Sequence, residues 1–483
     1  MHDLIVIGDD LSSYVAAAMA ANYGLDTVLV ARHGTGGVCL IGNLAFNIDP
    51  RPLSGFGALQ TCLALLAELD IPPIEQAGRL LNPAYQIILP EQRIDFYNEK
   101  EELINELIRE FPIYAEEIKA FYNSEEKKCR MFTDWLQTHP FIQPQDTKDY
   151  YDFLKIFLPQ LVSHQIEKIK LKSLLNRNAS LKKIFEAQNL LLGYTIDNKF
   201  SFSSSFQYCT PFRGIYSFEQ GKQHIFNSLI KKLEMKNGSY LNGFEVVSIK
   251  QESSIEIKIV DKAGNSSIIS AKKLIVSTIS EGMPLLPAAN KNFNFEYWIN
   301  PVYATYVPFT IHISCNWQCF PERMARHSAV VLDVEKEIFD NNIIILELHL
   351  SEDVSIRAAE SAALTATVFL PNNEEVWSRE NLLDQASSII EHLEFFLPFL
   401  KENINFFDLE KSIEISRNSR SAHSPKYKMR NSFLTGFAAR TNKTCFKNIF
   451  LTGASLSADI GFEGEIISGI NAATRVIPFS NHR

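Results

Sequence analysis

The chain opens with two short apolar runs that flank a helix-like segment. The first run, LIVIG at residues 4–8, ends in glycine, and the second run, DTVLVAR at residues 26–32, is equally apolar. Between them, SSYVAAAMAANYG at residues 12–24 is rich in alanine and favours a helix with a face of small residues. The pattern predicts a βαβ unit, the outline of a dinucleotide-binding domain.

The period of the hydrophobic positions changes further along the chain. From about residue 85 to residue 210, Leu, Ile and Phe recur three and four positions apart, with acids and lysines between them, which predicts a helical insertion. After a predicted turn at Asn237 and Gly238, alternating strands return. Residues 291–440 mix β-rich runs such as YATYVPFTIHISC with a helix, and residues 447–477 form a strand, a glycine-rich loop and a helix.

These changes predict an α/β protein in which two domains are interleaved along the chain. A Rossmann-like FAD/NAD(P)-binding domain is expected from residues 1–84, 213–290 and 441–483. A mixed α+β substrate domain is expected from residues 85–212, its helical part, and residues 291–440, its β-rich part.

Length and charge narrow the class of protein. A chain of 483 residues with 46% hydrophobic residues can fill two sizeable cores. A net charge of -9 gives no overall basic field, so nucleic acid is not an expected partner. The chain has no basic leader before its first strand and no apolar run of roughly 18 residues. We therefore expect a cytoplasmic protein without a transmembrane segment, for which peripheral membrane contact stays open.

The cysteines indicate reduced thiols. There are seven, without regular spacing. Cys315 and Cys319 are the one close pair, and no second Cys or His pair accompanies them, so we expect ordinary packing and no metal site.

Six motifs, in order, resemble those of the flavin amine-oxidase-like superfamily and, within it, the carotenoid (phytoene) desaturase and retinol saturase branch. They are LIVIGDDLSS, TGGVCLIGNLAFNID, REFPIYAEEIKAFY, YSFEQGKQHIFNSLIKKL followed by NGFEVVSI, AKKLIVST, and GFEGEIISGINAA. The resemblance spans nearly the whole chain. It implies an FAD domain and a lipid-facing substrate domain.

The resemblance also implies which positions would line the FAD site. In this chain they are Gly8, Asp10, Leu11, Ser12, Ser13, Arg32, Gly36, Gly37, Val246, Gly453, Ala454, Gly461, Phe462, Glu463 and Gly464. Catalytic residues are not assigned, because in such enzymes the flavin carries the chemistry and the protein mainly supplies shape.

The first motif departs from the family at its central glycine. In G-x-G-x-x-G the second glycine lets the backbone approach the pyrophosphate, and here Gly8, Asp10 and Ser13 occupy the three positions. Ser13 is a mild change. A carboxylate about 4 Å from a phosphate charge costs on the order of 4 kcal/mol at an effective dielectric near 20, so Asp10 opposes FAD binding. The alternative role of Asp9 and Asp10 is to cap the following helix, which would fill the site with protein.

Three further departures concern the same ligand. No acid lies between Asp26 and Asp49 to hold the adenosine ribose; Arg32 follows the second strand instead, where it either meets a 2′-phosphate, as in NADP readers, or is simply solvated. Ala454 replaces a commonly acidic position. Val38 replaces the arginine that usually follows the Gly-Gly pair.

The closing motif is retained, with Gly461, Gly464, Ser468 and Gly469 in place. The glycines indicate either residual flavin binding or close packing of a loop and a helix, and both readings stay open. Glu463 is expected to cap the helix.

Two histidines are candidates for acid–base chemistry. His224 and His327 are each expected to be surface or satisfied core histidines rather than an acid or base.

The sequence thus predicts a phytoene-desaturase-like member of the flavin oxidoreductases with an eroded FAD site. FAD binding is expected to be weakened or lost, which makes the chain a pseudoenzyme with a lipid-binding or protein-interaction role. The alternative is an active FAD-dependent desaturase, saturase or isomerase acting on a long apolar substrate.

Overall fold

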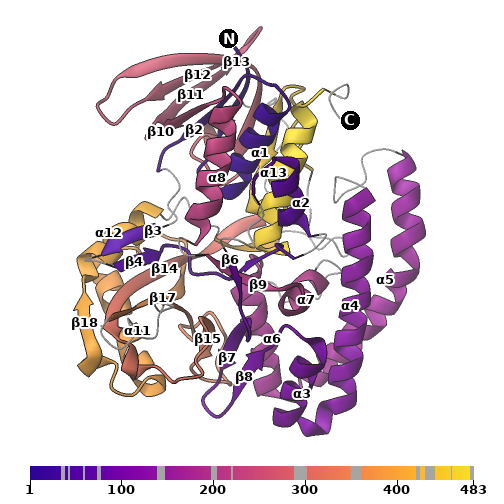
Figure 1. Cartoon of the computed structure of the whole chain (residues 1–483), viewed down its shortest axis with the longest axis vertical. Helices are drawn as coiled ribbons and strands as arrows, with labels where there is room; N and C mark the ends of the chain where they lie inside the picture. The colour runs from indigo at the N-terminus through magenta and orange to yellow at the C-terminus, as the bar shows by residue number, and fades with distance from the viewer. Residues whose placement is uncertain are drawn as a thin grey trace.

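The computed structural model describes residues 1–33, 38–41, 44–57, 60–72, 78–138, 147–196, 204–218, 221–287, 302–349, 361–419, 425–429, 441–457 and 460–478. These residues form two large β-sheets with helices packed against them and two small sheets, and the N-terminus and the C-terminal helix lie beside the same large sheet (Figure 1).

The first sheet has seven strands in the order β10-β2-β1-β13-β12-β11, with β20 also paired to β13. The strands are β1 (His2–Ile7), β2 (Thr27–Ala31), β10 (Ser239–Asn242), β11 (Glu245–Gln251), β12 (Ile255–Val260), β13 (Ser266–Ser277) and β20 (Ile449–Thr452). β1, β2, β10, β20 and the second half of β13 run parallel. The first half of β13 pairs antiparallel with β12, where Val260 lies opposite Ser266. One long strand thus joins a parallel sheet to an antiparallel meander.

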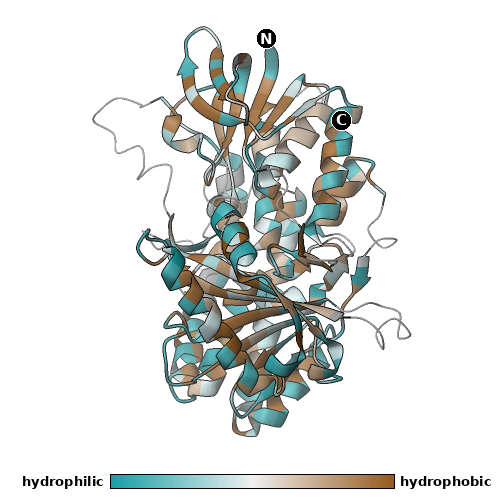
Figure 2. Ribbon diagram, turned by 90° about the vertical axis from the view of Figure 1, so that its left-hand side faces the viewer, coloured by the Kyte–Doolittle hydropathy of each residue, from teal (hydrophilic) through white to brown (hydrophobic). Residues whose placement is uncertain are grey.

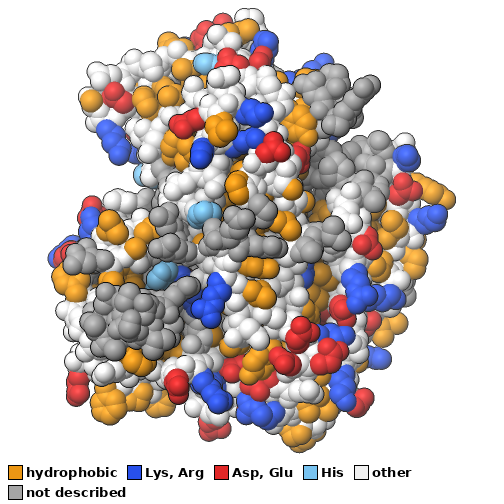
Figure 3. Space-filling view, viewed as in Figure 1, with side chains coloured by type: hydrophobic (Ala, Val, Ile, Leu, Met, Phe, Trp, Pro, Cys, Tyr) orange, Lys and Arg blue, Asp and Glu red, His pale blue; other side chains and the backbone are white. Residues whose placement is uncertain are grey.

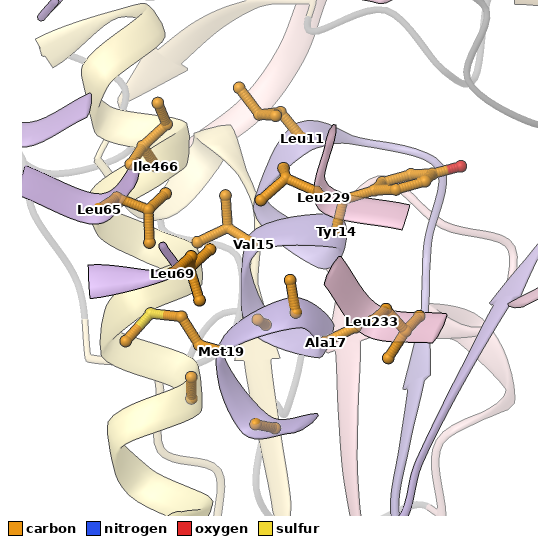
Figure 4. Packing of buried hydrophobic residues seen from close by; sticks show 14 of the residues in the cluster. Leu11, Tyr14, Val15, Ala17, Met19, Leu65, Leu69, Leu229, Leu233 and Ile466 are labelled. Carbon is orange, nitrogen blue, oxygen red and sulfur yellow. The ribbon is translucent and has the colours of Figure 1, made fainter. Parts of the chain in front are cut away.

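Four helices from distant parts of the chain pack together beside this sheet. They are α1 (Leu11–Asn22), α2 (Thr61–Glu68), α8 (Lys222–Met235) and α13 (Phe462–Val476). Every residue of α1 from Leu11 to Ala21 is buried, because its alanines let neighbours approach closely. Figure 4 shows Val15 and Met19 of α1 packed among Leu65, Leu69 and Ile466.

The contact between α1 and α13 requires a glycine. A Cβ atom at Gly469 would lie 2.5 Å from the Ser12 carbonyl oxygen and 2.8 Å from the Val15 Cβ atom. These backbones therefore approach as closely as glycine allows.

The second sheet has eight strands in the order β18-β14-β17-β16-β15-β7-β8, with β19 also paired to β14. The strands are β7 (Tyr85–Ile88), β8 (Arg93–Phe96), β14 (Val302–Asn316), β15 (His327–Val331), β16 (Ile343–His349), β17 (Ser361–Pro371), β18 (Ile404–Phe407) and β19 (Lys426–Met429). Helices α11 (Arg379–Phe396) and α12 (Leu409–Ser419) pack against it. Figure 2 shows hydrophobic residues along these strands and hydrophilic residues on the outer turns.

A helical region lies beside the second sheet, at the lower right of Figure 1. It consists of α3 (Lys100–Glu110), the short η2 (Pro112–Tyr114), α4 (Ala115–Thr138), α5 (Thr147–Leu175), α6 (Ala179–Leu192) and α7 (Ser205–Arg213). Among the helices of the described ranges, none is both long and apolar enough to cross a membrane.

The predicted start of the helical insertion is wrong. Residues 85–96 form β7 and β8, which belong to the second sheet. Residues Arg93–Phe96 alternate between half-buried and buried, the period of a strand, but four residues are too few to stand out from the helical pattern that follows.

The remaining short elements connect these layers. They are β3 (Val38–Ile41), β4 (Leu44–Asn47), β5 (Leu53–Ser54), β6 (Gly78–Leu80), β9 (Ile215–Phe218), η3 (Met283–Leu285), η4 (Trp317–Cys319), η5 (Lys401–Asn403) and η6 (Ala454–Leu456). β3 pairs with β4, while β5 and β6 both pair with β9.

Candidate functional site

The turn between β1 and α1 is built around a buried carboxyl group. Asp10 is 3% exposed, and its two oxygens accept hydrogen bonds from the Ser12 hydroxyl at 2.5 Å and the Ser13 hydroxyl at 2.6 Å. A Cβ atom at Gly8 would lie 2.3 Å from the Ser13 Oγ atom, so the tight turn needs glycine there. Leu11 is buried at the first helical position. These residues lie together, as the motif predicts.

Burial raises the pKa of Asp10. Hydrogen bonds from Ser12 and Ser13 act in the opposite direction, and the nearby Glu465 carboxylate on α13 raises the pKa further. A second acid, Glu465, thus lies close enough to Asp10 to raise its pKa. Two acids at this turn disfavour the binding of an anionic ligand there.

The predicted capping role of Asp10 is wrong. Asp10 is the N-cap residue of α1, but its side chain makes no hydrogen bond to a backbone N–H of the helix. The serine hydroxyls compete for its oxygens, and sequence position alone does not reveal this competition. Asp9 accepts a hydrogen bond from the His33 backbone N–H at 3.1 Å, outside the helix.

A small hollow lies on the other side of the same turn. Its lining includes Gly8, Asp9, Arg32 and Val246, so the predicted Arg32 and Val246 positions do meet near β1. The hollow holds about 20 Å³, which is room for about one water molecule.

Arg32 is already paired at the edge of this hollow. It forms an ion pair with Glu281 and a second one with Glu245 at 3.5 Å. These two carboxylates neutralise the charge that a 2′-phosphate would need.

Ala454 lies in a small apolar cluster. It is fully buried and packs with Tyr194 and Tyr427. Tyr427 comes from β19, and its backbone N–H donates to the Tyr194 carbonyl at 2.6 Å. A Cβ atom at the preceding Gly453 would lie 2.3 Å from the Thr278 Oγ1 atom, so only glycine lets the backbone approach Thr278 this closely. The cluster places two aromatic rings beside the loop that begins at Gly453.

The Tyr427 hydroxyl lies close enough to the Asp10 and Glu465 carboxyl groups to interact with them electrostatically. It is buried without a hydrogen-bond partner among the described residues. Burial raises its pKa, and the Asp10 and Glu465 carboxylates raise it further, so this hydroxyl stays neutral. Tyr194 donates to Glu465 at 2.5 Å.

The first turn of α13 also carries a buried acid, but that acid is paired. The Glu463 carboxylate, 1% exposed, accepts two hydrogen bonds from the Arg213 guanidinium, at 2.6 and 2.7 Å. The Ser54 hydroxyl lies 3.3 Å from it. The predicted capping role of Glu463 is therefore wrong, since α13 has no side-chain cap and Glu463 points to Arg213 of α7 instead.

The glycines of the closing motif contact protein backbone. A Cβ atom at Gly461 would lie 2.1 Å from the Leu192 carbonyl oxygen, and one at Gly464 would lie 2.4 Å from the Ser457 carbonyl oxygen. Phe462 between them is buried. These contacts account for the glycines by packing alone.

The sequence did not predict a cluster of buried basic side chains that the structure shows near Tyr194. Lys426 of β19 is fully buried, and its ammonium group donates to the Leu190 and Gly193 carbonyls at the end of α6. Burial lowers the pKa of Lys426 well below its ordinary value, and the nearby Arg51 guanidinium lowers it further. Arg51 lies 4.2 Å from the centre of the Tyr194 ring.

A shared acid neutralises part of this cluster. Arg51 forms an ion pair with Asp49, and the Lys222 Nζ atom lies 2.6 Å from the same carboxylate. Asp49 ends the predicted second motif, but nothing in the sequence indicated its partners. The alternation of Lys426 and Lys428 with Tyr427 and Met429 is a local signal, but it predicts a strand rather than a site.

Gly36 and Gly37 lie outside the described residues, so their predicted place in the FAD site stays a prediction.

Neither histidine is placed for acid–base chemistry. His327 is buried, with its Nδ1 atom 3.0 Å from the Pro50 carbonyl oxygen, and burial together with Arg326 lowers its pKa to about 3. His224 stacks on Phe218 with ring centres 5.9 Å apart. Within the described ranges, no group of three or more His, Cys, Asp and Glu side chains is arranged to hold a metal ion. All seven cysteines are free thiols.

Solved oxidoreductase structures share this architecture over nearly their whole length. An oxidoreductase from Methanosarcina mazei has a TM-score of 0.54 and 13% identity, covering 97% of this chain and 99% of that one. Wild-type putrescine oxidase bound to putrescine has a TM-score of 0.55 and 12% identity, with 99% of each chain covered. Cyclohexylamine oxidase from Brevibacterium oxydans has a TM-score of 0.53 and 10% identity, covering 99% of this chain and 98% of that one.

No protein-family model and no curated protein matches the chain. At these identities the structural likeness establishes the fold. The predicted α/β fold, as seen in these oxidoreductase structures, is therefore confirmed. The desaturase and saturase branch stays a prediction.

FAD is the cofactor that this fold leads one to expect, and the described residues fit it poorly. Its pyrophosphate would meet Asp10, a buried carboxyl group whose neighbour Glu465 is also an acid. At the other side of the turn, Arg32 is paired to two carboxylates. The described part of the site therefore offers acids where the cofactor needs donors.

Proposed function

We propose that this chain is a non-catalytic binding protein built on the flavin amine-oxidase fold, with a flavin site closed by its own side chains. The observation that carries the proposal is the buried Asp10 carboxyl group, held by Ser12 and Ser13 at the first turn of α1. In this arrangement a carboxyl group of the protein occupies the place where a bound dinucleotide would put a phosphate.

The ligand that we propose is apolar or lipid-like rather than a nucleotide. Supporting this, α4 and α5 enclose a groove of about 270 Å³, near the lower end of the range for small-molecule sites. Phe121, Leu171 and Leu174 contribute apolar surface to it, and charged side chains of both signs complete much of the lining, namely Glu117, Glu125, Glu167, Lys128, Lys168 and Lys170. A protein partner at the same region would be a second form of this binding role.

The alternative is an active FAD-dependent oxidoreductase acting on C–C bonds of a long apolar substrate. Two observations favour it: the coverage of 97% or more of this chain by oxidoreductase structures, and the retained glycines at the start of α13. Under this alternative the packing contacts of these glycines would coexist with a bound flavin.

The first experiment measures flavin in the purified protein by its absorbance near about 450 nm and by release on denaturation. We expect no stoichiometric flavin. One flavin per chain would overturn the proposal and support the alternative.

The second experiment measures binding of FAD and of ADP, which carries the adenosine and the pyrophosphate without the flavin, by calorimetry. We expect wild-type protein to bind neither and Asp10→Gly to gain affinity, by up to several hundredfold, because the unfavourable charge is gone. The matched control is Asp9→Asn, which removes an adjacent charge that is paired outside the helix. Equal gains in both variants would contradict the role assigned to Asp10.

A further inference from the structure

Helix α5 carries an apolar stripe on its outer face. Tyr151, Leu154, Leu158, Ile166 and Ile169 are separated by three, four, eight and three positions, so they lie on one side of the helix. They are between 48% and 69% exposed. Single exposed apolar residues are ordinary, but a row of five along one helix is not.

The opposite face of the same helix fills an aromatic core. Phe153 and Phe157 are buried, and both rings pack edge-on against Trp135 of α4, with ring centres 5.5 and 5.7 Å apart. α5 is therefore apolar on two opposite faces, and packing inside the molecule explains only the inner one.

The described charged residues of α5 with the greatest exposure are lysines, while Asp152, Glu167 and Lys168 are partly buried. The exposed ionisable side chains that the structure describes on this helix are Lys148, Lys155, Lys170 and Lys172. The Glu167 side chain is 42% exposed, and its carboxylate accepts from the Ser124 hydroxyl at 2.6 Å and pairs with Lys128 at 3.4 Å. On a helical projection the four lysines fall on both sides of the stripe.

We propose that α5 docks on an anionic membrane surface, with its stripe inserted among the lipids and its lysines against the head groups. An apolar face bordered by lysines is the arrangement of helices that lie in the membrane interface. The long lysine stems let the ammonium groups reach the head groups while the stripe is buried. The helix has 29 residues, or about 44 Å of length, and can lie flat.

The charge pattern favours a lipid surface over a second copy of this chain. Two copies packed through the stripe would bring lysines of one helix toward lysines of the other. An anionic surface instead gains from each lysine.

The position of α5 is compatible with docking. The helix lies at the right-hand edge of the molecule in Figure 1, packed on α4 and α6, and the corresponding edge of Figure 3 carries hydrophobic and basic side chains together. Docking through this face does not depend on whether flavin is bound, so this inference and the proposed function fail separately.

The test is flotation of the full chain with vesicles of phosphatidylcholine, with and without about 30 mol% phosphatidylserine. We expect binding only to the anionic vesicles, weakening as salt rises. The charge variant Lys148→Glu/Lys155→Glu/Lys172→Glu, which leaves the groove between α4 and α5 unchanged, is expected to lower the partition coefficient at least about 30-fold.

The stripe variant Leu154→Gln/Leu158→Gln/Ile169→Gln is expected to lower it by a similar factor of about 30 or more. The matched control is Phe395→Gln/Phe399→Gln, which removes two exposed aromatic residues near the end of α11 and should leave binding unchanged. Circular dichroism checks that each variant keeps its fold. Since every substituted side chain is exposed, folding should survive.

Three outcomes would overturn the inference. They are the absence of binding to anionic vesicles, equal loss of binding in the Phe395→Gln/Phe399→Gln control, and a dimer in sedimentation that the stripe variant dissolves. The last would assign the stripe to a second copy of this chain.

Discussion

Helices α1 and α13 contact each other, and each begins with a buried acid. The two acids differ in their hydrogen-bond partners, because one has a cation and the other has only hydroxyl groups. Glu463 in the first turn of α13 is matched by the Arg213 guanidinium through two short hydrogen bonds. Asp10 at the start of α1 receives only neutral hydroxyl groups, and its pKa is raised by burial.

The difference separates an acid paired within the fold from an acid that, in the function we propose, opposes an anionic ligand. The Glu463–Arg213 pair is neutral as a whole, so it holds α7 against α13 without creating a field in the site. Asp10 keeps its charge when ionised, and that charge acts on whatever approaches the turn. Chemically similar residues at similar positions therefore have different effects because of one arginine.

The largest expected effect comes from breaking the matched pair. Arg213→Met leaves Glu463 buried without its cation and should lower the free energy of unfolding by about 3–5 kcal/mol, measured by urea denaturation. In the double variant Arg213→Met/Glu463→Gln most of that loss should be recovered. No recovery would mean that Arg213 acts mainly through its packing over Phe206, whose ring centre lies 3.9 Å away.

The next effect tests the contact that holds the two helices together. Gly469→Ala places a Cβ atom 2.5 Å from the Ser12 carbonyl, so α1 and α13 must move apart. We expect a loss of about 2 kcal/mol in unfolding free energy. Thr474→Ala, on the same helix and half-buried, is the control and should change it by less than about 0.5 kcal/mol.

Asp10→Asn should have a smaller effect that depends on pH. Because the pKa of Asp10 is raised above its ordinary 3.8, the folded protein holds this proton more tightly than the unfolded chain. That stabilisation is complete below pH 3.8 and is lost as the pH rises through the folded pKa. The variant should therefore gain on wild type with rising pH, reaching about 1 kcal/mol at neutral pH.

Denaturation midpoints measured across that pH range would check this. Asn can still accept from one serine and donate to the other, so the hydrogen bonds are conserved in number. A stability difference that stays constant with pH would show that Asp10 does not titrate as proposed.

The smallest effect is expected at Arg32. Its ion pairs with Glu245 and Glu281 are partly exposed, so Arg32→Ala should change stability by less than about 1 kcal/mol. Calorimetry with NADP should detect no binding in either protein. Binding by wild type that the variant loses would instead favour the nucleotide-reading role of Arg32.

The sequence predicted those parts of the molecule that depend on local periodicity. The opening βαβ unit, the turn at Asn237, where φ is 62°, and the α/β class all follow from nearby residues. The strands at residues 85–96 were missed because their pattern is short. They pair with each other, and β7 joins the larger sheet through β15, more than 200 positions away.

The sequence predicted which residues lie together at the first turn of the candidate site. It did not predict which side chains they pair with. Gly8, Asp10 and Ser13 meet as the motif requires. The roles of Glu463 and Asp10 as helix caps were wrong, since each found other partners. Arg213 lies 250 positions from Glu463, and Lys426 lies 236 positions from Leu190. Such distant pairings leave no periodic trace in one sequence.

The packing of α1 against α13 has a consequence for biosynthesis. The surface of α1 around Gly469 is covered by a helix that begins at Phe462, about 450 positions later. At about 5–20 residues per second, a ribosome takes roughly 20–90 s to supply that cover. During this interval the alanine-rich surface of α1 lacks the helix that covers it in the folded protein.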